Sequence, residues 1–373
     1  AMLALYGIKC LPEIYGMFSF CHYDVEKDIY TLARDRYGQK PMFYHQGLNT
    51  FYFASEIKSL LVAGIKNIPD LTSVYEYLDS GKIDCSKNTW FKEIKQLEAG
   101  QYLQIQRSVI KNITKWYNLK NINKIIIPKK ISDRNDFIND IFIKVSEEHL
   151  NSDTKIGVKL SGGLDSSTLL ASMEKNKKYL SNQCFTVDFG SSFSEKEWVI
   201  ETAKFFHKDA IISSYTINDF INDFDNMIFT HEGPLGGLMN CAFEKIYQNA
   251  NDSNIRVLLD GTGLDEAFGG YRVHHLFYLN NLYNKKDKNF LKYVNDYSKK
   301  WKIKITDIVL ELKRLNNILN FVQDGSSFSQ KKYTTEYIQS FGVKNMHKAD
   351  KHTNIHSHFI NYIEHSKIPK NTR

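Results

Sequence analysis

The sequence predicts an α/β protein of two parts, in which an antiparallel β-rich segment is followed by a domain built on a doubly wound parallel sheet. Short aromatic and apolar runs separated by polar turns occupy residues 1–115, and such runs are typical of antiparallel strands. From residue 131 onward, apolar runs alternate with segments of helical length, which is the pattern of βαβ units. The composition, 42% hydrophobic and 24% charged over 373 residues, supports a packed core and excludes a disordered chain.

The N-terminal strands are expected where aromatic and β-branched residues gather between polar turns. These strands are Met17–Tyr23, Ile29–Ala33, Phe43–His45, Phe51–Ala54 and Gln101–Ile105. After them, residues 116–130 are rich in Asn, Lys and Ile and contain Pro128, a composition that favours a linker. We therefore expect a first domain over residues 1–115 and a second over residues 131–373.

The second part alternates between apolar strands and amphipathic helices. The expected strands are Ile156–Leu160, Cys184–Asp188, Ala210–Ser213 and Ile255–Leu259. The expected helices are Asp136–Leu150, Ser166–Glu174, Ser194–His207, Asn218–Phe229 and Leu238–Asn249, and the chain beyond Tyr271 is helical in pattern. In a parallel sheet the loops that follow the strands gather at one edge, where ligands bind.

The overall composition narrows the class of function and the compartment. A net charge of +7 permits a nucleotide or nucleic-acid partner without requiring one. The five cysteines include no Cys-x-x-Cys pair, which argues against a disulfide framework or a cysteine-type zinc site and favours a reducing cytoplasm. No apolar run approaches the ~18 residues that a membrane-spanning helix needs, so no membrane partner is expected.

The strongest functional signal is the segment Leu-Ser-Gly-Gly-Leu-Asp-Ser-Ser at residues 160–167, which follows an expected strand and opens an expected helix. Its glycines let backbone N–H groups approach an anion, its serines add hydroxyl donors, and the helix N-terminus adds positive potential. Asp165 places a carboxylate beside this phosphate cradle, which makes sense if a cation such as Mg²⁺ arrives with the phosphates. A glycine pair used only for packing is the less favoured interpretation, and the segment is not a Walker A motif because no lysine follows the second glycine. The cradle residues are Ser161, Gly162, Gly163, Asp165, Ser166 and Ser167.

A second glycine-rich segment, Asp-Gly-Thr-Gly-Leu-Asp-Glu-Ala-Phe-Gly-Gly-Tyr at residues 260–271, also follows an expected strand. In a parallel sheet this segment would leave the same edge as the first, so Asp265 is expected to face the same phosphates or metal ion as Asp165. The competing interpretation is a solvated turn with a helix-capping carboxylate. The two segments together favour a nucleotide site.

These two segments resemble the pyrophosphate loop and the second signature of glutamine-dependent asparagine synthetases and their relatives. The N-terminal part agrees, because residues 16–20, 32–44 and 53–58 are similar, in the same order, to the later half of the glutaminase domain of that family. The resemblance covers most of the chain up to residue 275. It implies a remnant of a glutaminase-type (Ntn hydrolase) domain, followed by an ATP pyrophosphatase domain of the adenine nucleotide alpha hydrolase type.

The resemblance implies a ligase that forms a C–N bond in two steps, as in the synthesis of asparagine. Mg²⁺-ATP would adenylate a carboxylate, with aspartate as the first choice of acceptor, and pyrophosphate would leave. Nitrogen from glutamine or from free ammonia would then displace AMP. The cradle residues would hold the pyrophosphate, and Asp165 and Asp265 would be the catalytic carboxylates that hold the metal ion. The positions that match the family's nucleotide contacts are Lys159 and Val187, which reach adenine largely through the backbone, and Asp260 and Gly261, which line the acyl-adenylate pocket.

The chain also departs from the family pattern. It begins Ala1-Met2-Leu3 rather than with the catalytic cysteine of the glutaminase domain, so the sequence as given is not expected to hydrolyse glutamine, and Cys10 is interpreted as structural. Near the other end, Ile368-Pro369-Lys370 approaches family segments that are missing, so the synthetase domain is expected to be incomplete there. Thr262 occupies a position where asparagine synthetases carry a glutamate, and a threonine cannot act as a carboxylate base.

Several alternatives therefore stay open. Thr262 leaves room for an acceptor other than aspartate, such as a sugar, a lactam precursor or a peptide. A non-catalytic homologue is a further alternative, although two carboxylates facing a phosphate site are costly without a cation. A tRNA-thiolating ATP pyrophosphatase is disfavoured because it would need a reactive cysteine pair, and a nucleic-acid partner is not expected. The sequence also leaves open whether the chain forms a homodimer.

Overall fold

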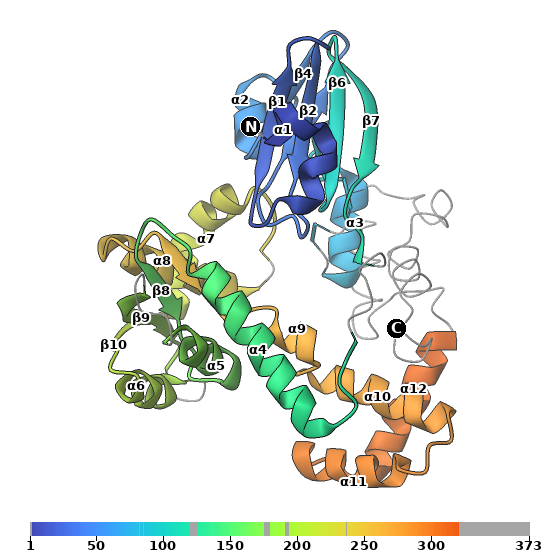
Figure 1. Cartoon of the computed structure of the whole chain (residues 1–373), viewed down its shortest axis with the longest axis vertical. Coiled ribbons are helices and arrows are strands. Elements are labelled where there is room, and N and C mark those ends of the chain that lie inside the picture. The colour runs from blue at the N-terminus through green and yellow to red at the C-terminus, as the bar shows by residue number, and fades with distance from the viewer. Residues whose placement is uncertain are drawn as a thin grey trace. The chain divides into compact units, whose positions relative to one another are not determined.

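The structure, a computed structural model, describes residues 2–81, 83–84, 86–119, 126–174, 180–190, 194–235 and 237–320 (Figure 1). The chain divides into two compact units. Among the described residues, the first unit contains residues 2–119, 232–235 and 313–320, and the second contains residues 126–231 and 237–312. Part of the expected linker and the segment Ile368-Pro369-Lys370 lie outside the described residues.

The first unit is built on two antiparallel sheets, one with the strand order β1-β2-β6-β7 and the other with the order β4-β3-β5. Side chains from both sheets, among them Leu32, Tyr44 and Leu103, form one buried cluster, so the two sheets pack face to face. This arrangement confirms the antiparallel, β-rich N-terminal part that the sequence predicts. The strands are β1 (Ser19–Asp24), β2 (Ile29–Arg34), β3 (Phe43–Gln46), β4 (Phe51–Ala54), β5 (Lys95–Gln96), β6 (Gln101–Gln106) and β7 (Val109–Lys115).

Strand β7 and helix α3 have no counterpart among the sequence expectations. The residues of β7 are mostly exposed, so they lack the alternation of apolar and polar side chains that marks a half-buried strand, and pairing with β6 is what holds them in the sheet. Helix α3 is capped by Asp70, whose carboxylate accepts hydrogen bonds from two N–H groups of its first turn, and it ends at Gly81 with a φ of +68°. The helices of this unit are α1 (Met2–Tyr6), a 3₁₀ helix (Gly7–Glu13), α2 (Ile57–Val62) and α3 (Leu71–Ser80).

The second unit is built on a four-stranded parallel sheet with the order β10-β9-β8-β11. Its strands β8 (Ile156–Lys159), β9 (Leu180–Asp188), β10 (Asp209–Ser214) and β11 (Val257–Leu259) overlap the four expected apolar runs. The helices are α4 (Ile131–His149), α5 (Leu164–Met173), α6 (Lys196–Phe205), α7 (Ile217–His231), α8 (Leu238–Asp252), α9 (Leu264–Phe268), α10 (Arg272–Asn284), α11 (Phe290–Trp301) and α12 (Ile305–Asn320), of which residues 305–312 belong to this unit.

Adjacent residues of β9 show how the sheet is covered. Cys184 is buried with side chains of α5 and α6, whereas Phe185 is buried with Ile246 and Ala250 of α8. Since successive side chains of a strand point to opposite faces, helices lie on both faces of the sheet. The doubly wound parallel sheet that the sequence predicts is therefore confirmed.

Between β11 and residue 320 the chain is helical, as its pattern predicts. Leu279, Val294 and Ile308 are buried in one cluster that joins α10, α11 and α12. An ion pair between Arg272 and Glu311 adds a polar contact between α10 and α12. Of the helices that the structure describes, none has the length and apolar character needed to cross a membrane.

A short segment between α7 and α8 belongs to the first unit. The Glu232 carboxylate accepts hydrogen bonds from the backbone N–H groups of Ile57 and Lys58, both at 2.7 Å, in the first turn of α2. The hydroxyl of Tyr77 in α3 donates to the carbonyl oxygen of Leu235 at 3.1 Å. Glu232 thus caps a helix that lies about 175 positions away in the chain.

Replacing Glu232 with alanine is expected to lower the free energy of unfolding by about 1–3 kcal/mol, because two helix N–H groups lose a charged acceptor. Denaturant titration followed by circular dichroism measures the change. Glu56→Ala is the matched control, since it removes an exposed carboxylate beside the same helix and is expected to cost less than about 0.5 kcal/mol. Equal losses in the two variants would contradict the capping role of Glu232.

Candidate active site

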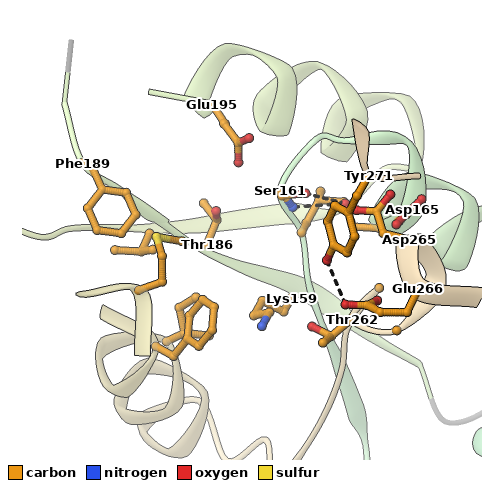
Figure 2. A pocket seen from close by; sticks show the side chains of 18 residues that line it. Lys159, Ser161, Asp165, Thr186, Phe189, Glu195, Thr262, Asp265, Glu266 and Tyr271 are labelled. Carbon is orange, nitrogen blue, oxygen red and sulfur yellow. Dashed lines mark hydrogen bonds between the residues drawn. The ribbon is translucent and has the colours of Figure 1, made fainter. Parts of the chain in front are cut away.

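A cavity of about 450 Å³ lies in the second unit at the carboxyl ends of β8, β9 and β11 (Figure 2). The loops that follow parallel strands converge at this edge of the sheet, as the sequence predicts. The predicted site residues that line the cavity are Lys159, Ser161, Asp165, Ser166, Val187, Gly261 and Asp265. The predicted site residues that are neighbours of the lining but not part of it are Gly162, Gly163, Ser167 and Asp260.

The first loop, between β8 and α5, turns at Gly162, which has a φ of +71°. A Cβ atom on Gly162 would lie 2.6 Å from the Cβ of Trp198 and 2.8 Å from the backbone nitrogen of Val199. The turn therefore requires glycine twice over, for its left-handed backbone and for its close approach to the first turn of α6. Gly163 follows as the residue that precedes α5.

Hydrogen bonds that involve serine hydroxyl groups stabilise this loop. The buried Oγ of Ser166 accepts a hydrogen bond from the Ser161 N–H at 3.2 Å and lies 3.0 Å from the Ser161 Oγ. The Gly163 N–H donates to the Ser161 Oγ at 3.3 Å. The N–H groups in the first turn of any α-helix lack acceptors within that helix, and those of α5 begin at this loop. The loop is therefore a turn held by hydrogen bonds, with several N–H and O–H donors that suit an anion.

The second loop, between β11 and α10, packs directly on the first. A Cβ atom on Gly261 would lie 2.9 Å from the Cβ of Asp165 and 3.0 Å from the backbone nitrogen of Ser166, so only glycine permits this contact. Gly270 packs directly against the carboxylate of Asp265, because a Cβ on Gly270 would overlap the Asp265 Oδ1. The glycines of the second segment thus bring Asp265 to the cavity that Asp165 also lines.

The side chains of Asp165 and Asp265 lie close to each other at the cavity (Figure 2). Burial raises the pKa of Asp165, and the negative charges of Asp265 and Glu266 raise it further. Glu266 accepts a hydrogen bond from the Tyr271 hydroxyl at 2.8 Å, and this bond lowers the pKa of Glu266. A cation between the carboxylates would relieve the repulsion.

The chemistry of these donors fits Mg²⁺, which accepts one or two protein carboxylates and takes its remaining ligands from phosphate oxygens and water. In the part of the chain that the structure describes, no three His, Cys, Asp or Glu side chains gather to hold a metal ion. If Asp165 and Asp265 held such an ion, its remaining ligands would have to be phosphate oxygens and water.

Lys159, at the end of β8, and Asp260, directly after β11, form an ion pair of 2.6 Å. The Lys159 ammonium also lies 3.8 Å from the centroid of the Phe243 ring. Burial raises the pKa of Asp260, but hydrogen bonds from Lys159 and from the Thr262 N–H outweigh burial, so the net effect is a lowered pKa. Asp260 is therefore held as a carboxylate beside the lysine.

One wall of the cavity is apolar. Val187 lies in β9 and Phe189 directly follows it, and α8 contributes Met239, Phe243 and Ile246, whose spacing places them on one helix face. A flat group with apolar faces, such as a nucleobase, suits this wall. Sequence reasoning missed it, because the same spacing equally predicts packing of an amphipathic helix on a sheet. The lining residues that sequence reasoning missed are Thr186, Phe189, Glu195, Met239, Phe243 and Ile246.

Two family models match the chain. The model described as asparagine synthase matches residues 138–358, and the model described as a glutamine amidotransferase domain matches residues 1–117. The first match covers more than half of the chain and contains both loops of the cavity.

Curated proteins with similar sequences carry related names. A putative asparagine synthetase (glutamine-hydrolyzing) 2 from Methanocaldococcus jannaschii is 28% identical over 275 residues, which are 72% of this chain and 52% of that protein. Asparagine synthetase (glutamine-hydrolyzing) 1 from Bacillus subtilis is 28% identical over 273 residues, 72% of this chain and 42% of that protein. The amidase chry2 from Gibberella zeae is 25% identical over 286 residues, 73% of this chain and 42% of that protein. The chain thus spans about half the length of these relatives, or less.

Proposed function

Because the chain belongs to the asparagine synthase family, we propose that its second unit catalyses the ATP-dependent amidation of a carboxylate through an acyl-adenylate. In the full-length protein the acceptor would be aspartate and the nitrogen would come from glutamine, so the enzyme would be a C–N ligase that makes asparagine. The observation that carries this proposal is the meeting of two glycine-rich loops at one cavity, with the carboxylates of Asp165 and Asp265 opposite an apolar wall.

The proposed reaction has two bond exchanges. A carboxylate oxygen of the acceptor attacks the α-phosphorus of ATP, and the bond to the bridging oxygen breaks as pyrophosphate leaves with the electron pair. Ammonia then attacks the acyl carbon and gives up a proton, and AMP leaves. The first-turn N–H groups of α5 and the hydroxyl of Ser161 would bind the pyrophosphate, while Asp165 and Asp265 would hold Mg²⁺, which supplies positive charge to the phosphates.

An acceptor other than aspartate is the second candidate. Thr262 lines the cavity with a hydroxyl group, where asparagine synthetases carry a glutamate, and a hydroxyl cannot accept a proton from an incoming amine as a carboxylate can. The name of one relative, an amidase rather than a synthetase, supports keeping this candidate.

The proposed function predicts that the chain exchanges radiolabelled pyrophosphate into ATP only when its acceptor acid is present. A panel of acids that includes L-aspartate identifies the acceptor. Addition of ammonium chloride to the active pair should then yield AMP and amide in equal amounts, measured by chromatography. Release of ADP instead of AMP, or exchange that does not depend on any acid, would overturn the proposal.

We also propose the domain division, the compartment and the assembly that the sequence suggests. Residues 1–115 would be a partial glutaminase-type domain, residues 116–130 a linker and residues 131–373 the synthetase domain. A cytoplasmic location is supported by the cysteines that the structure describes, which are all free: Cys10, Cys21, Cys184 and Cys241. Light scattering on the purified protein would test for a homodimer.

A further inference from the structure

The charge of the cavity is unusual for a site that takes a polyanion. Among the described residues that line it, Lys159 is the only one with a cationic side chain, whereas Asp165, Glu195, Asp265 and Glu266 are carboxylates. Among the residues that the structure describes, a nucleoside triphosphate entering this cavity therefore meets one positive side chain. If the proposed function holds, the position of Lys159 determines which phosphate group of the nucleotide its ammonium contacts.

The Lys159 side chain is held from two sides. Its ammonium donates to the Asp260 Oδ2 at 2.6 Å and lies 3.8 Å from the Phe243 ring centroid, and the side chain is only 15% exposed. The second oxygen of Asp260 accepts the Thr262 N–H at 2.9 Å, so the carboxylate is fixed as well. Because an ammonium group has three N–H donors, the bond to Asp260 leaves donors for a ligand.

Lys159 lies where the apolar wall meets the two loops. It contacts Phe243 of the wall, and through Asp260 it contacts the start of the loop that carries Asp265. Figure 2 shows Lys159 between Phe189 on one side and the pair Asp165 and Asp265 on the other. In a nucleotide with its base on the wall and its terminal phosphates at the first loop, the α-phosphate occupies this intermediate position.

We propose that the Lys159 ammonium, held by Asp260, binds the α-phosphate of the nucleotide. The α-phosphate is the group that the acceptor attacks, and its oxygens keep their negative charge when AMP leaves. A cation at this place would therefore serve both bond exchanges of the proposed reaction. This inference rests on the proposed function and adds a side-chain role for Lys159 that differs from a backbone contact with adenine.

A purely structural ion pair is the competing interpretation, in which Lys159 and Asp260 only join the ends of β8 and β11. Removing one partner of a half-buried pair leaves an unpaired charge, which can destabilise the fold by itself. The double variant Lys159→Met with Asp260→Asn avoids this problem, because it replaces both charges with neutral side chains of similar size. Lys159→Arg keeps a cation at the site and serves as the matched control.

Isothermal titration of AMP and adenosine into the wild type and the variants tests the proposal. The wild type is expected to bind AMP about 10- to 100-fold more tightly than adenosine, the strength of a charge-assisted hydrogen bond. The double variant should bind the two ligands within about threefold, while Lys159→Arg should keep most of the preference. Adenosine affinity and the melting temperature of the double variant are expected to stay close to those of the wild type.

The outcomes separate this inference from the proposed function. A double variant that retains the wild-type preference for AMP, or a wild type without that preference, overturns the role of Lys159. Acid-dependent pyrophosphate exchange still decides the proposed function in either case. The preference for AMP could disappear in the double variant while the wild type shows no acid-dependent pyrophosphate exchange. That result would support the contact between Lys159 and the phosphate and overturn the proposed ligase activity.

Discussion

Asp165→Asn is expected to lower acid-dependent pyrophosphate exchange by roughly 100- to 1,000-fold and, at the same time, to raise the melting temperature of the ligand-free protein at neutral pH. The loss of activity follows if Asp165 and Asp265 hold the metal ion that neutralises the phosphates. The gain in stability follows because the charged Asp165 lies close to two other negative charges, Asp265 and Glu266.

The pH dependence of this stability gain has a definite sign. Burial and then the two neighbouring carboxylates raise the pKa of Asp165 in the folded protein. The folded state therefore binds a proton more tightly than the unfolded state, so Asp165 favours folding below its unfolded pKa and this contribution is lost as the pH rises through the raised folded value. The melting temperatures of the wild type and Asp165→Asn should thus converge below about pH 4 and separate toward pH 7.

Differential scanning calorimetry from pH 3.5 to pH 8, with and without Mg²⁺ and ATP, measures both effects. Asp153→Asn is the matched control, because it makes the same chemical change at an exposed aspartate before β8. The control should retain its exchange activity, and ligands should raise its melting temperature as they do for the wild type. An Asp165→Asn protein that is less stable than the wild type at pH 7 would contradict the repulsion, and one that is fully active would contradict the metal site.

Gly162→Ala is expected to destabilise the second unit by about 2–5 kcal/mol and to remove exchange activity. One part of the cost, about 1–2 kcal/mol, comes from placing a side chain at a φ of +71°. The remainder comes from the new Cβ, which would lie 2.6 Å from the Cβ of Trp198 and within 2.8 Å of the α6 backbone, so the loop or the helix must move. Either movement displaces the donors around Ser161.

Gly81→Ala separates these two contributions. Gly81 has a φ of +68°, but a Cβ there would meet no atom within 4 Å, so this variant carries the backbone strain without the steric contact. Chemical denaturation of both variants should give a loss for Gly162→Ala that exceeds the loss for Gly81→Ala by about 1–3 kcal/mol. Similar losses would indicate that the approach to α6 is relaxed at little cost, and the loop would then not require glycine for packing.

The alternation of apolar strands and amphipathic helices was enough to predict the parallel sheet, because each element there carries its own hydrophobic pattern. The residues that follow β8 and β11 were also found from sequence, since Gly162 and Gly261 stand where only glycine allows the backbone to approach a neighbour. Strand β7 escaped prediction because its sequence is polar and exposed, and its hydrogen bonds with β6 make it a strand.

The apolar wall of the cavity was not predicted from the sequence, because its pattern is too common rather than too weak. Met239, Phe243 and Ile246 have the spacing of an ordinary buried helix face, and nothing in that spacing distinguishes side chains that line a cavity from side chains in a core. The Lys159–Asp260 pair was likewise hidden, because its partners are 101 positions apart by their residue numbers and meet only when β8 and β11 pair in parallel.

By itself, the sequence determined local features of this protein: the strands and helices that carry a clear hydrophobic pattern, the turns that need glycine, and the carboxylates placed next to them. These follow from backbone sterics and hydrophobic period, which act over a few neighbouring residues. Only the tertiary structure decided which groups share a cavity, because the pairing of β8 with β11 and the packing of α8 on the sheet bring distant segments together. The charge of the described part of the site, with one lysine and four carboxylates, likewise results from bringing these segments together.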